Sequence, residues 1–215
     1  MIFDLDGTLI DSAQDLAISM NATRERFELP PLNPSLIYSY VGNGAAVLVK
    51  KAMGEGTSQD VLEQALAFFL RFYRVHALEH TRFYPGMHAA IQKLAADGHT
   101  LSVLTNKPVR ISRDIIAALG AAPLFSRVYG GDSFPAKKPD PIGVTTLLTE
   151  TNTSAAQTVL VGDSGVDVQT ARNAGIRSCG VAWGFQPDAF RAHPPDTIVH
   201  RPEELVELFA NFTKL

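Results

Sequence analysis

The apolar residues of the chain fall into short continuous runs, each of which closes in a polar or glycine-bearing turn. Continuous runs of this kind are typical of strands buried on both faces of a parallel sheet. Between the runs, apolar residues recur with helical spacing and stop at a glycine, as at Gly98, Gly120 and Gly175. The pattern predicts strands over residues 2–5, 101–104, 127–129, 159–161, 179–182 and 197–199, and helices over residues 87–97, 112–119 and 166–174.

Residues 12–80 break this alternation of strands and helices. They contain no convincing strand, but helical patterning covers residues 13–27, 44–52 and 58–77. Because the break falls between the first two strands, we expect an all-helical insertion above the strand ends, joined to the sheet by hinge strands near residues 10–13 and 81–86. One apolar stripe is expected to form the core of this insertion: Leu66, Phe69, Leu70 and Tyr73.

The first predicted strand is unusually short. It has only three residues before Asp4, whereas a central strand usually needs about five or six. A trimmed terminus or a misassigned start site would explain this length, and the sequence leaves both open.

Composition bounds the kind of protein. With 215 residues, 46% hydrophobic and 19% charged, the chain is long enough for one buried core and an inserted unit. A net charge of -3 gives no argument for a nucleic-acid or acidic-membrane partner. The sequence has neither a bilayer-spanning apolar run nor a signal-peptide pattern. Cys179 is the single cysteine, so no internal disulfide forms. We therefore expect a cytoplasmic protein.

Four polar clusters follow predicted strands, where ligands bind in open α/β sheets. Paired carboxylates can hold a divalent cation beside a nucleophile. A hydroxyl group and an amide group can donate hydrogen bonds to phosphate oxygens. A lysine in a proline-stiffened turn offers a fixed positive charge. Together these groups supply what phosphoryl transfer requires. The clusters contain Asp4 and Asp6, Thr105 and Asn106, Lys138, and Asp163 with Asp167.

The four clusters form an ordered set of motifs: Asp-x-Asp-Gly-Thr at residues 4–8, a hydrophobic strand ending in Thr105, Lys138 followed by proline, and Gly-Asp-x-x-x-Asp at residues 162–167. This order resembles that of the haloacid dehalogenase superfamily of phosphatases, over residues 3–184. The resemblance implies an α/β fold with a Rossmann-like parallel-sheet core, residues 1–12 and 82–215, and an inserted all-helical cap, residues 13–81. Segments 41–44, 105–108, 130–135 and 182–185 are similar to those of the bacterial phosphoglycolate phosphatase branch.

The resemblance also implies catalytic roles. Asp4 is expected to be the nucleophile that forms an aspartyl-phosphate intermediate. Asp6 is expected to protonate the leaving alcohol and then to activate water. Mg²⁺ is expected between the carboxylates of Asp4 and Asp163 and the backbone carbonyl of Asp6. Thr105 and Lys138 are expected to bind the transferring phosphoryl group.

Further residues are expected around these. Asn106 would support the bound phosphoryl group, and Thr8, Gly42 and Asn43 are expected to contact the substrate. Ser164 and Asp167 are expected to lie behind the metal and Lys138, where Asp167 would orient Lys138 or a metal-bound water.

We therefore expect a Mg²⁺-dependent phosphomonoester hydrolase, with 2-phosphoglycolate as the leading substrate. Asp6 favours ester hydrolysis, because dehalogenases and phosphonate-cleaving relatives lack an acid at that position. The sequence leaves open a pyrophosphatase, a sugar phosphatase or a nucleotidase, because the motifs build the chemistry and the cap chooses the leaving group. A remote alternative is a non-catalytic phosphate-binding module. The expected partner is a small phosphorylated metabolite, bound by a monomer or a homodimer.

Overall fold

A six-stranded parallel sheet forms the centre of the computed structural model, which describes residues 1–185, 188 and 190–210. The strands occur in the order β5-β4-β1-β6-β7-β8. Because β1 lies between β4 and β6, the residues that follow these three strands meet at one edge of the sheet. The strands are β1 (Ile2–Phe3), β4 (Ser102–Leu104), β5 (Arg127–Tyr129), β6 (Val159–Gly162), β7 (Arg177–Val181) and β8 (Thr197–Val199).

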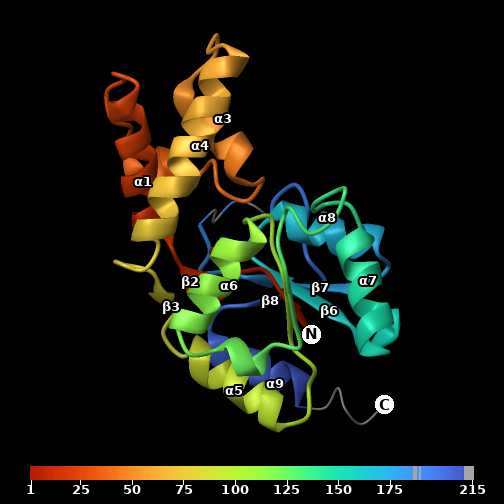
Figure 1. Cartoon of the computed structure of the whole chain (residues 1–215). Helices are drawn as coiled ribbons and strands as arrows, with labels where there is room; N and C mark the ends of the chain where they lie inside the picture. Colours follow the sequence, from red (N-terminus) through yellow and green to blue (C-terminus); the bar gives the residue numbers. More distant parts are fainter. Residues whose placement is uncertain (186–187, 189, 211–215) are drawn as a thin grey trace.

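Both faces of the sheet are covered by helices. Because successive strand residues point to opposite sides, neighbouring residues of one strand are buried under different helices. Phe3 packs in one apolar cluster with residues of α5 (Met87–Ala96), α6 (Val109–Ala118) and α9 (Pro202–Phe209). Ile2 packs in a second cluster with residues of α7 (Ile142–Thr151) and α8 (Gly165–Asn173). Figure 1 shows α7 and α8 on one side of the strands and α5 and α9 on the other. The predicted α/β fold with a Rossmann-like core is confirmed.

Along the chain, a group of four helices is inserted between the central strand β1 and the next strand of the sheet, β4. They lie between β2 (Ile10–Asp11) and β3 (Arg82–Phe83), which pair antiparallel as the predicted hinge strands. Figure 1 shows α1, α3 and α4 gathered at one end of the molecule, far from α5 and α9. We call this unit the helical insertion; its helices are α1 (Ala13–Arg26), α2 (Pro34–Tyr38), α3 (Ala45–Met53) and α4 (Gln59–His76).

The inner face of α4 follows from its sequence. The Ser58 side chain accepts a hydrogen bond from the N–H of Val61 and so caps the helix. Ala65, Phe69 and Tyr73, each four residues apart, are buried on one stripe. They belong to the same apolar cluster as Phe3 of β1, so the insertion and the sheet share one core.

The observed elements depart from the sequence prediction in a few places. β1 ends at Phe3 rather than at residue 5, and α6 begins directly after Pro108 rather than at residue 112. Helices α2, α7 and α9 were not predicted. The threonines of α7 obscure its pattern, because their hydroxyls bond carbonyls one turn back, as Thr146 does to Ile142.

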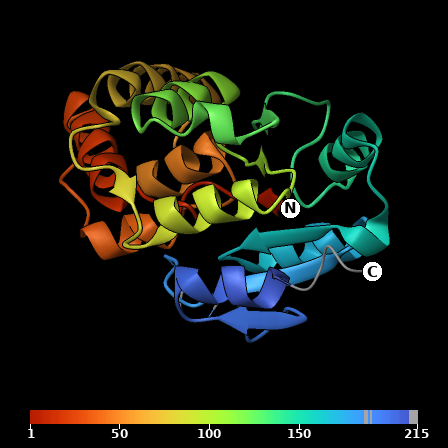
Figure 2. The ribbon, with the colours of Figure 1, turned by 90° about the horizontal axis from the view of Figure 1, so that it is seen from below.

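The edge strand β8 lies away from the helical insertion. Figure 2 shows β8 and α9 in dark blue on one side of the molecule and α6 in green on the other.

Among the described residues, no helix has the length and apolar character needed to cross a membrane.

Candidate active site

Asp4 follows the central strand and is held in one orientation. Its N–H donates to the carbonyl of Val161 at 2.9 Å, which continues the pairing of β1 with β6. Its Oδ1 accepts from the N–H of Leu5 at 2.8 Å and lies 3.0 Å from Lys138 Nζ. The side chain of Thr105 also bonds this carboxylate. The structure therefore brings the first three predicted motifs together at one buried carboxyl group.

Lys138 is fixed between two carboxylates. Its Nζ lies 2.6 Å from Asp167 Oδ1 and 3.0 Å from Asp4 Oδ1. Asp167 Oδ2 accepts hydrogen bonds from the N–H and the hydroxyl of Ser164, at 3.1 and 2.6 Å. These bonds belong to the capping box at the N-terminus of α8. Burial opposes the charge of Lys138, but the two carboxylates outweigh it and raise its pKa. Asp167 thus orients Lys138.

The carboxylates at this edge of the sheet suit a metal ion. Oxygens of Asp4, Asp163 and Asp167 lie within 4.8 Å of one another, and all three residues are buried. Burial raises the pKa of Asp4 to about 6, and burial with the neighbouring carboxylates raises that of Asp163 well above its ordinary value. Crowded carboxylates with raised pKa values need more positive charge than Lys138 supplies, so the cluster fits a divalent cation.

Two glycines leave the space that Asp163 occupies. A Cβ added at Gly7 or at Gly184 would lie far inside van der Waals contact with the Asp163 carboxylate. Gly7 also has a φ of +77°, in the region that favours glycine. The N–H of Phe185 donates to Asp163 Oδ2 at 3.0 Å and fixes the carboxylate from the other side.

The Asp6 carboxylate is bonded to a different set of groups. It accepts from the Ser12 hydroxyl at 2.6 Å and from Lys107 Nζ at 2.8 and 3.0 Å. Lys107 Nζ also donates to the hydroxyl of Tyr73, at 2.6 Å. Asp6 is not part of the described group of three carboxylates, and its expected role in proton transfer stays a prediction.

Sequence reasoning assigned no role to Lys107 and placed Tyr73 only in the core of the insertion. Lys107 is only 6% exposed, and burial by itself would lower the pKa of its ammonium group. The interactions with Asp6 and Tyr73 outweigh burial and raise the pKa. Tyr73 is buried with Phe69 as expected, but its hydroxyl leaves the core of the insertion and reaches Lys107. Burial raises the pKa of this hydroxyl to about 12. The position of Lys107 two residues after Thr105 was the available signal.

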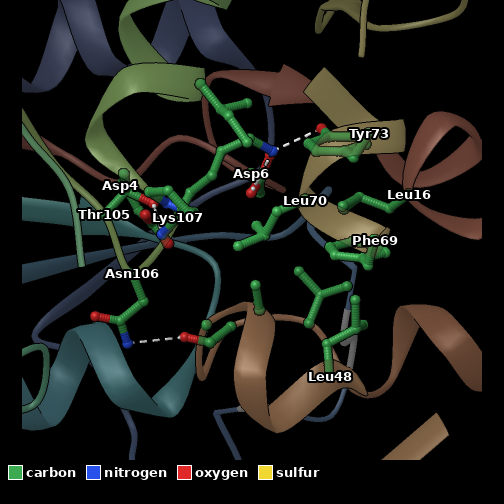
Figure 3. A pocket seen from close by; sticks show the side chains of 16 residues that line it. Asp4, Asp6, Leu16, Leu48, Phe69, Leu70, Tyr73, Thr105, Asn106 and Lys107 are labelled. Atoms are coloured by element: carbon green, nitrogen blue, oxygen red, sulfur yellow. Dashed lines mark hydrogen bonds and ion pairs between the residues drawn. The ribbon is translucent and has the colours of Figure 1, made fainter. Parts of the chain in front are cut away.

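A small cavity of about 50 Å³ lies between the sheet edge and the insertion. Figure 3 shows Asp4, Asp6 and Thr105 on the sheet side and apolar side chains of the insertion facing them, with Lys107 and Tyr73 joined between. The lining from the insertion is largely apolar: Leu16, Val41, Ala45, Leu48, Phe69 and Leu70.

Three residues predicted to contact the substrate make other contacts in the structure. Asn106 lines the cavity, but its Nδ2 donates to the carbonyls of Gly42 and Lys138, both at 3.0 Å. Its amide therefore ties the insertion to the Lys138 loop. Gly42 lines the cavity, whereas neither Thr8 nor Asn43 is among the described lining residues.

Local contacts explain these two positions. Thr8 is fully buried, and its carbonyl accepts from Trp183 Nε1 at 3.1 Å. The Asn43 carbonyl accepts from Lys137 Nζ at 2.6 Å, outside the cavity lining. Substrate contact by Thr8 or Asn43 stays a prediction that the lining does not support.

Comparison with known proteins agrees with this geometry. A family model for haloacid dehalogenase-like hydrolases matches residues 1–181. The chain is 33% identical to a phosphoglycolate phosphatase of Vibrio parahaemolyticus, over 97% of this chain and 94% of the relative. It is 37% identical to a phosphoglycolate phosphatase of Vibrio cholerae, over 85% of this chain and 84% of the relative.

A solved structure has the same fold. A crystal structure from Haemophilus somnus, described as a predicted phosphoglycolate phosphatase, is similar with a TM-score of 0.90 and 31% identity, over 96% of both chains. The predicted superfamily and the predicted hydrolase class are thereby confirmed. On the family match, the sequence relatives and the ordered motifs, the chain belongs to the haloacid dehalogenase-like hydrolase family.

Proposed function

We propose that the protein is a Mg²⁺-dependent phosphomonoester hydrolase whose substrate is 2-phosphoglycolate. The arrangement of Asp4, Lys138 and Asp163 supports the chemistry, because it sets a buried nucleophile beside a fixed cation and a carboxylate cluster that fits a metal. When bound between Asp4, Asp163 and the backbone carbonyl of Asp6, Mg²⁺ supplies positive charge against the phosphate dianion.

In the first step, a carboxylate oxygen of Asp4 attacks phosphorus while the bond from phosphorus to the bridging oxygen breaks. The leaving alkoxide takes a proton from Asp6, which becomes a carboxylate. In the second step, Asp6 removes a proton from water, and the resulting hydroxide displaces Asp4 from phosphorus to release phosphate. Throughout, Lys138 and Thr105 hold the phosphoryl oxygens, and Asp167 keeps Lys138 in place.

We also propose that the helical insertion acts as the cap of this site, over residues 13–81. β2 and β3 form the hinge at which the chain enters and leaves it. Closure would exclude water from the phosphoryl group, and reopening would release product. Three hydrogen bonds between the sheet side and the insertion hold the closed arrangement. They join Asn106 to Gly42, Lys107 to Tyr73, and Lys137 to Asn43.

The cavity volume is the observation that favours a very small leaving group. About 50 Å³ lies far below the roughly 300–1,000 Å³ of cavities for drug-sized ligands. So small a cavity favours a leaving group such as the two-carbon glycolate group over a nucleoside or a sugar. The names of the two Vibrio relatives agree with this choice. Pyrophosphate is also small, but it has no carbon to pack against the apolar lining from the insertion.

The test is phosphate release from a panel that contains 2-phosphoglycolate, pyrophosphate, a hexose phosphate and a nucleoside monophosphate. Each substrate is assayed with Mg²⁺ and with a chelator. We expect the highest kcat/KM for 2-phosphoglycolate, and activity only with the metal. D4N should abolish turnover, because an amide is a poor nucleophile toward phosphorus.

Other outcomes are equally informative. A higher kcat/KM for another substrate would keep the mechanism and reject 2-phosphoglycolate. Full activity of D4N would reject the mechanism, and no turnover of any substrate would favour the phosphate-binding module. The cytoplasmic location and the choice between monomer and homodimer stay predictions.

A further inference from the structure

Lys107 has no part in the phosphoryl chemistry described above. Thr105 and Lys138 hold the phosphoryl group in that scheme, yet a different buried lysine, Lys107, lines the cavity. Among the described residues that line the cavity, Lys107 is the one basic residue. The ion pair with Asp6 offsets the cost of burying the charge of Lys107, and its place in the cavity lining lets the same ammonium also meet a bound substrate.

The position of Lys107 relative to Asp6 suggests what it binds. Asp6 donates its proton to the bridging oxygen of the substrate, so that oxygen must lie against the Asp6 carboxyl group. Lys107 Nζ is 2.8 and 3.0 Å from the two Asp6 oxygens. In 2-phosphoglycolate, a single carbon separates the bridging oxygen from the carboxylate. The substrate carboxylate therefore comes within reach of Lys107 when the bridging oxygen meets Asp6.

The hydroxyl of Tyr73 offers a second donor at the same point. It lies 2.6 Å from Lys107 Nζ and projects from α4 of the insertion, whereas Lys107 belongs to the sheet side. Figure 3 shows the two side chains meeting from opposite walls of the cavity. A carboxylate bound there would contact both the sheet side and the insertion.

We propose that Lys107 Nζ and the Tyr73 hydroxyl bind the carboxylate of the substrate and select phosphorylated 2-hydroxy acids over phosphomonoesters that carry no carboxylate. This inference rests on the proposed function. The apolar lining around the pair strengthens the selection, because a carboxylate buried among Leu48, Phe69 and Leu70 without a cation would be strongly disfavoured.

The test compares 2-phosphoglycolate with ethyl phosphate, which has the same two carbons and no carboxylate. The measured quantity is the ratio of their kcat/KM values in the wild type, K107M, K107R and Y73F. We expect K107M to lower this ratio about 100-fold, because the substrate loses the cation that pairs with its carboxylate. K107R should restore most of the ratio, since it keeps the charge, and Y73F should lower it about 10-fold.

Lys137 provides the matched control. It also donates to the insertion, at Asn43, but it lies outside the cavity lining. K137M should leave the ratio unchanged. If K107M does not fold, as judged by circular dichroism, the ratio measured in Y73F decides instead.

Two results must be distinguished. An equal loss for both substrates in K107M or Y73F would overturn the inference, because the residue would then act on Asp6 or on closure. A wild type that does not prefer 2-phosphoglycolate over ethyl phosphate would instead overturn the proposed substrate. The first result is read from the variants and the second from the wild type alone.

Discussion

Asp15 and Thr81 join the entrance and the exit of the helical insertion. Asp15 Oδ2 accepts from the N–H of Thr81 at 2.8 Å and from its hydroxyl at 2.7 Å. The N–H of His80 donates to both oxygens of Asp15 at 3.0 Å. Asp15 lies in the first turn of α1, and Thr81 directly precedes β3. One buried carboxylate therefore fixes how the two chain crossings lie beside each other.

D15A should destabilise the protein substantially. The substitution leaves the two buried donors of Thr81 and the part-buried N–H of His80 without an acceptor, at a cost of about 3 kcal/mol in the free energy of unfolding. Urea denaturation followed by circular dichroism measures this. D60A is the control, because Asp60 also lies in the first turn of a helix but is exposed, and it should change stability by no more than about 0.5 kcal/mol. Equal effects of D15A and D60A would contradict the linkage.

D167N should reduce turnover more than it reduces stability. The substitution removes the charge that Lys138 faces at 2.6 Å, so the ammonium loses its fixed position beside Asp4. We expect kcat to fall about 100-fold. S164A removes only one donor to Asp167 and should have a smaller effect. A kcat for D167N equal to that of the wild type would show that Lys138 is positioned by other groups.

G7A should weaken metal binding, whereas G120A should not. Gly7 and Gly120 have nearly equal φ values, +77° and +75°, so alanine strains the backbone at both, by about 1 kcal/mol. A Cβ at Gly7 meets the Asp163 carboxylate, whereas a Cβ at Gly120 meets open space. Mg²⁺ titration by isothermal calorimetry should show a higher Kd in G7A alone. Equal affinities in the two variants would argue against Asp163 as a ligand.

Stability should depend on pH through Asp4. Its pKa is 3.8 ordinarily and about 6 in the folded chain, so the folded state binds more protons between these values. The stability of the metal-free protein therefore falls as pH rises from about 4 to about 6. Mg²⁺ binds the ionised carboxylate, so it should raise Tm more at pH 7 than at pH 5. Thermal melts with chelator or Mg²⁺ at both pH values measure this.

D4N isolates the contribution of that carboxyl group. Because the amide does not titrate, the difference in Tm between wild type and D4N with chelator should change between pH 4 and 6. A difference that stays constant across this interval would assign the pH dependence to other groups.

The sheet and the place of Asp4 at its edge could be predicted from sequence because both depend on local pattern. Continuous apolar runs indicate buried parallel strands, and the carboxyl end of such a strand places Asp4 at the ligand edge. The helix ends at Gly98, Gly120 and Gly175 were likewise visible, because each glycine follows a helix. Predicted bounds differed from the observed ones by a few residues, as is expected where caps and packing decide them.

The pairing of Lys107 with Asp6 and Tyr73 could not be predicted, because it depends on distant segments. Lys107 is 101 residues from Asp6 and 34 from Tyr73. A lysine after a strand end is ordinarily exposed, and an apolar stripe on a helix indicates burial without saying what covers it. The tertiary fold alone brings these side chains to one cavity.

The central position of β1 constrains the order in which the protein folds. Ile2 and Phe3 pair with residues 102 and 103 on one side and residues 160 and 161 on the other. During synthesis, this short strand emerges before either of its neighbours, and it finds its second neighbour only after most of the described chain has been made. Long sequence separations of this kind slow folding, because large loops close before the contacts form. Asp4, which directly follows β1, is thus translated before the segments that β1 pairs with, and it reaches its place at the sheet edge only after they have been made.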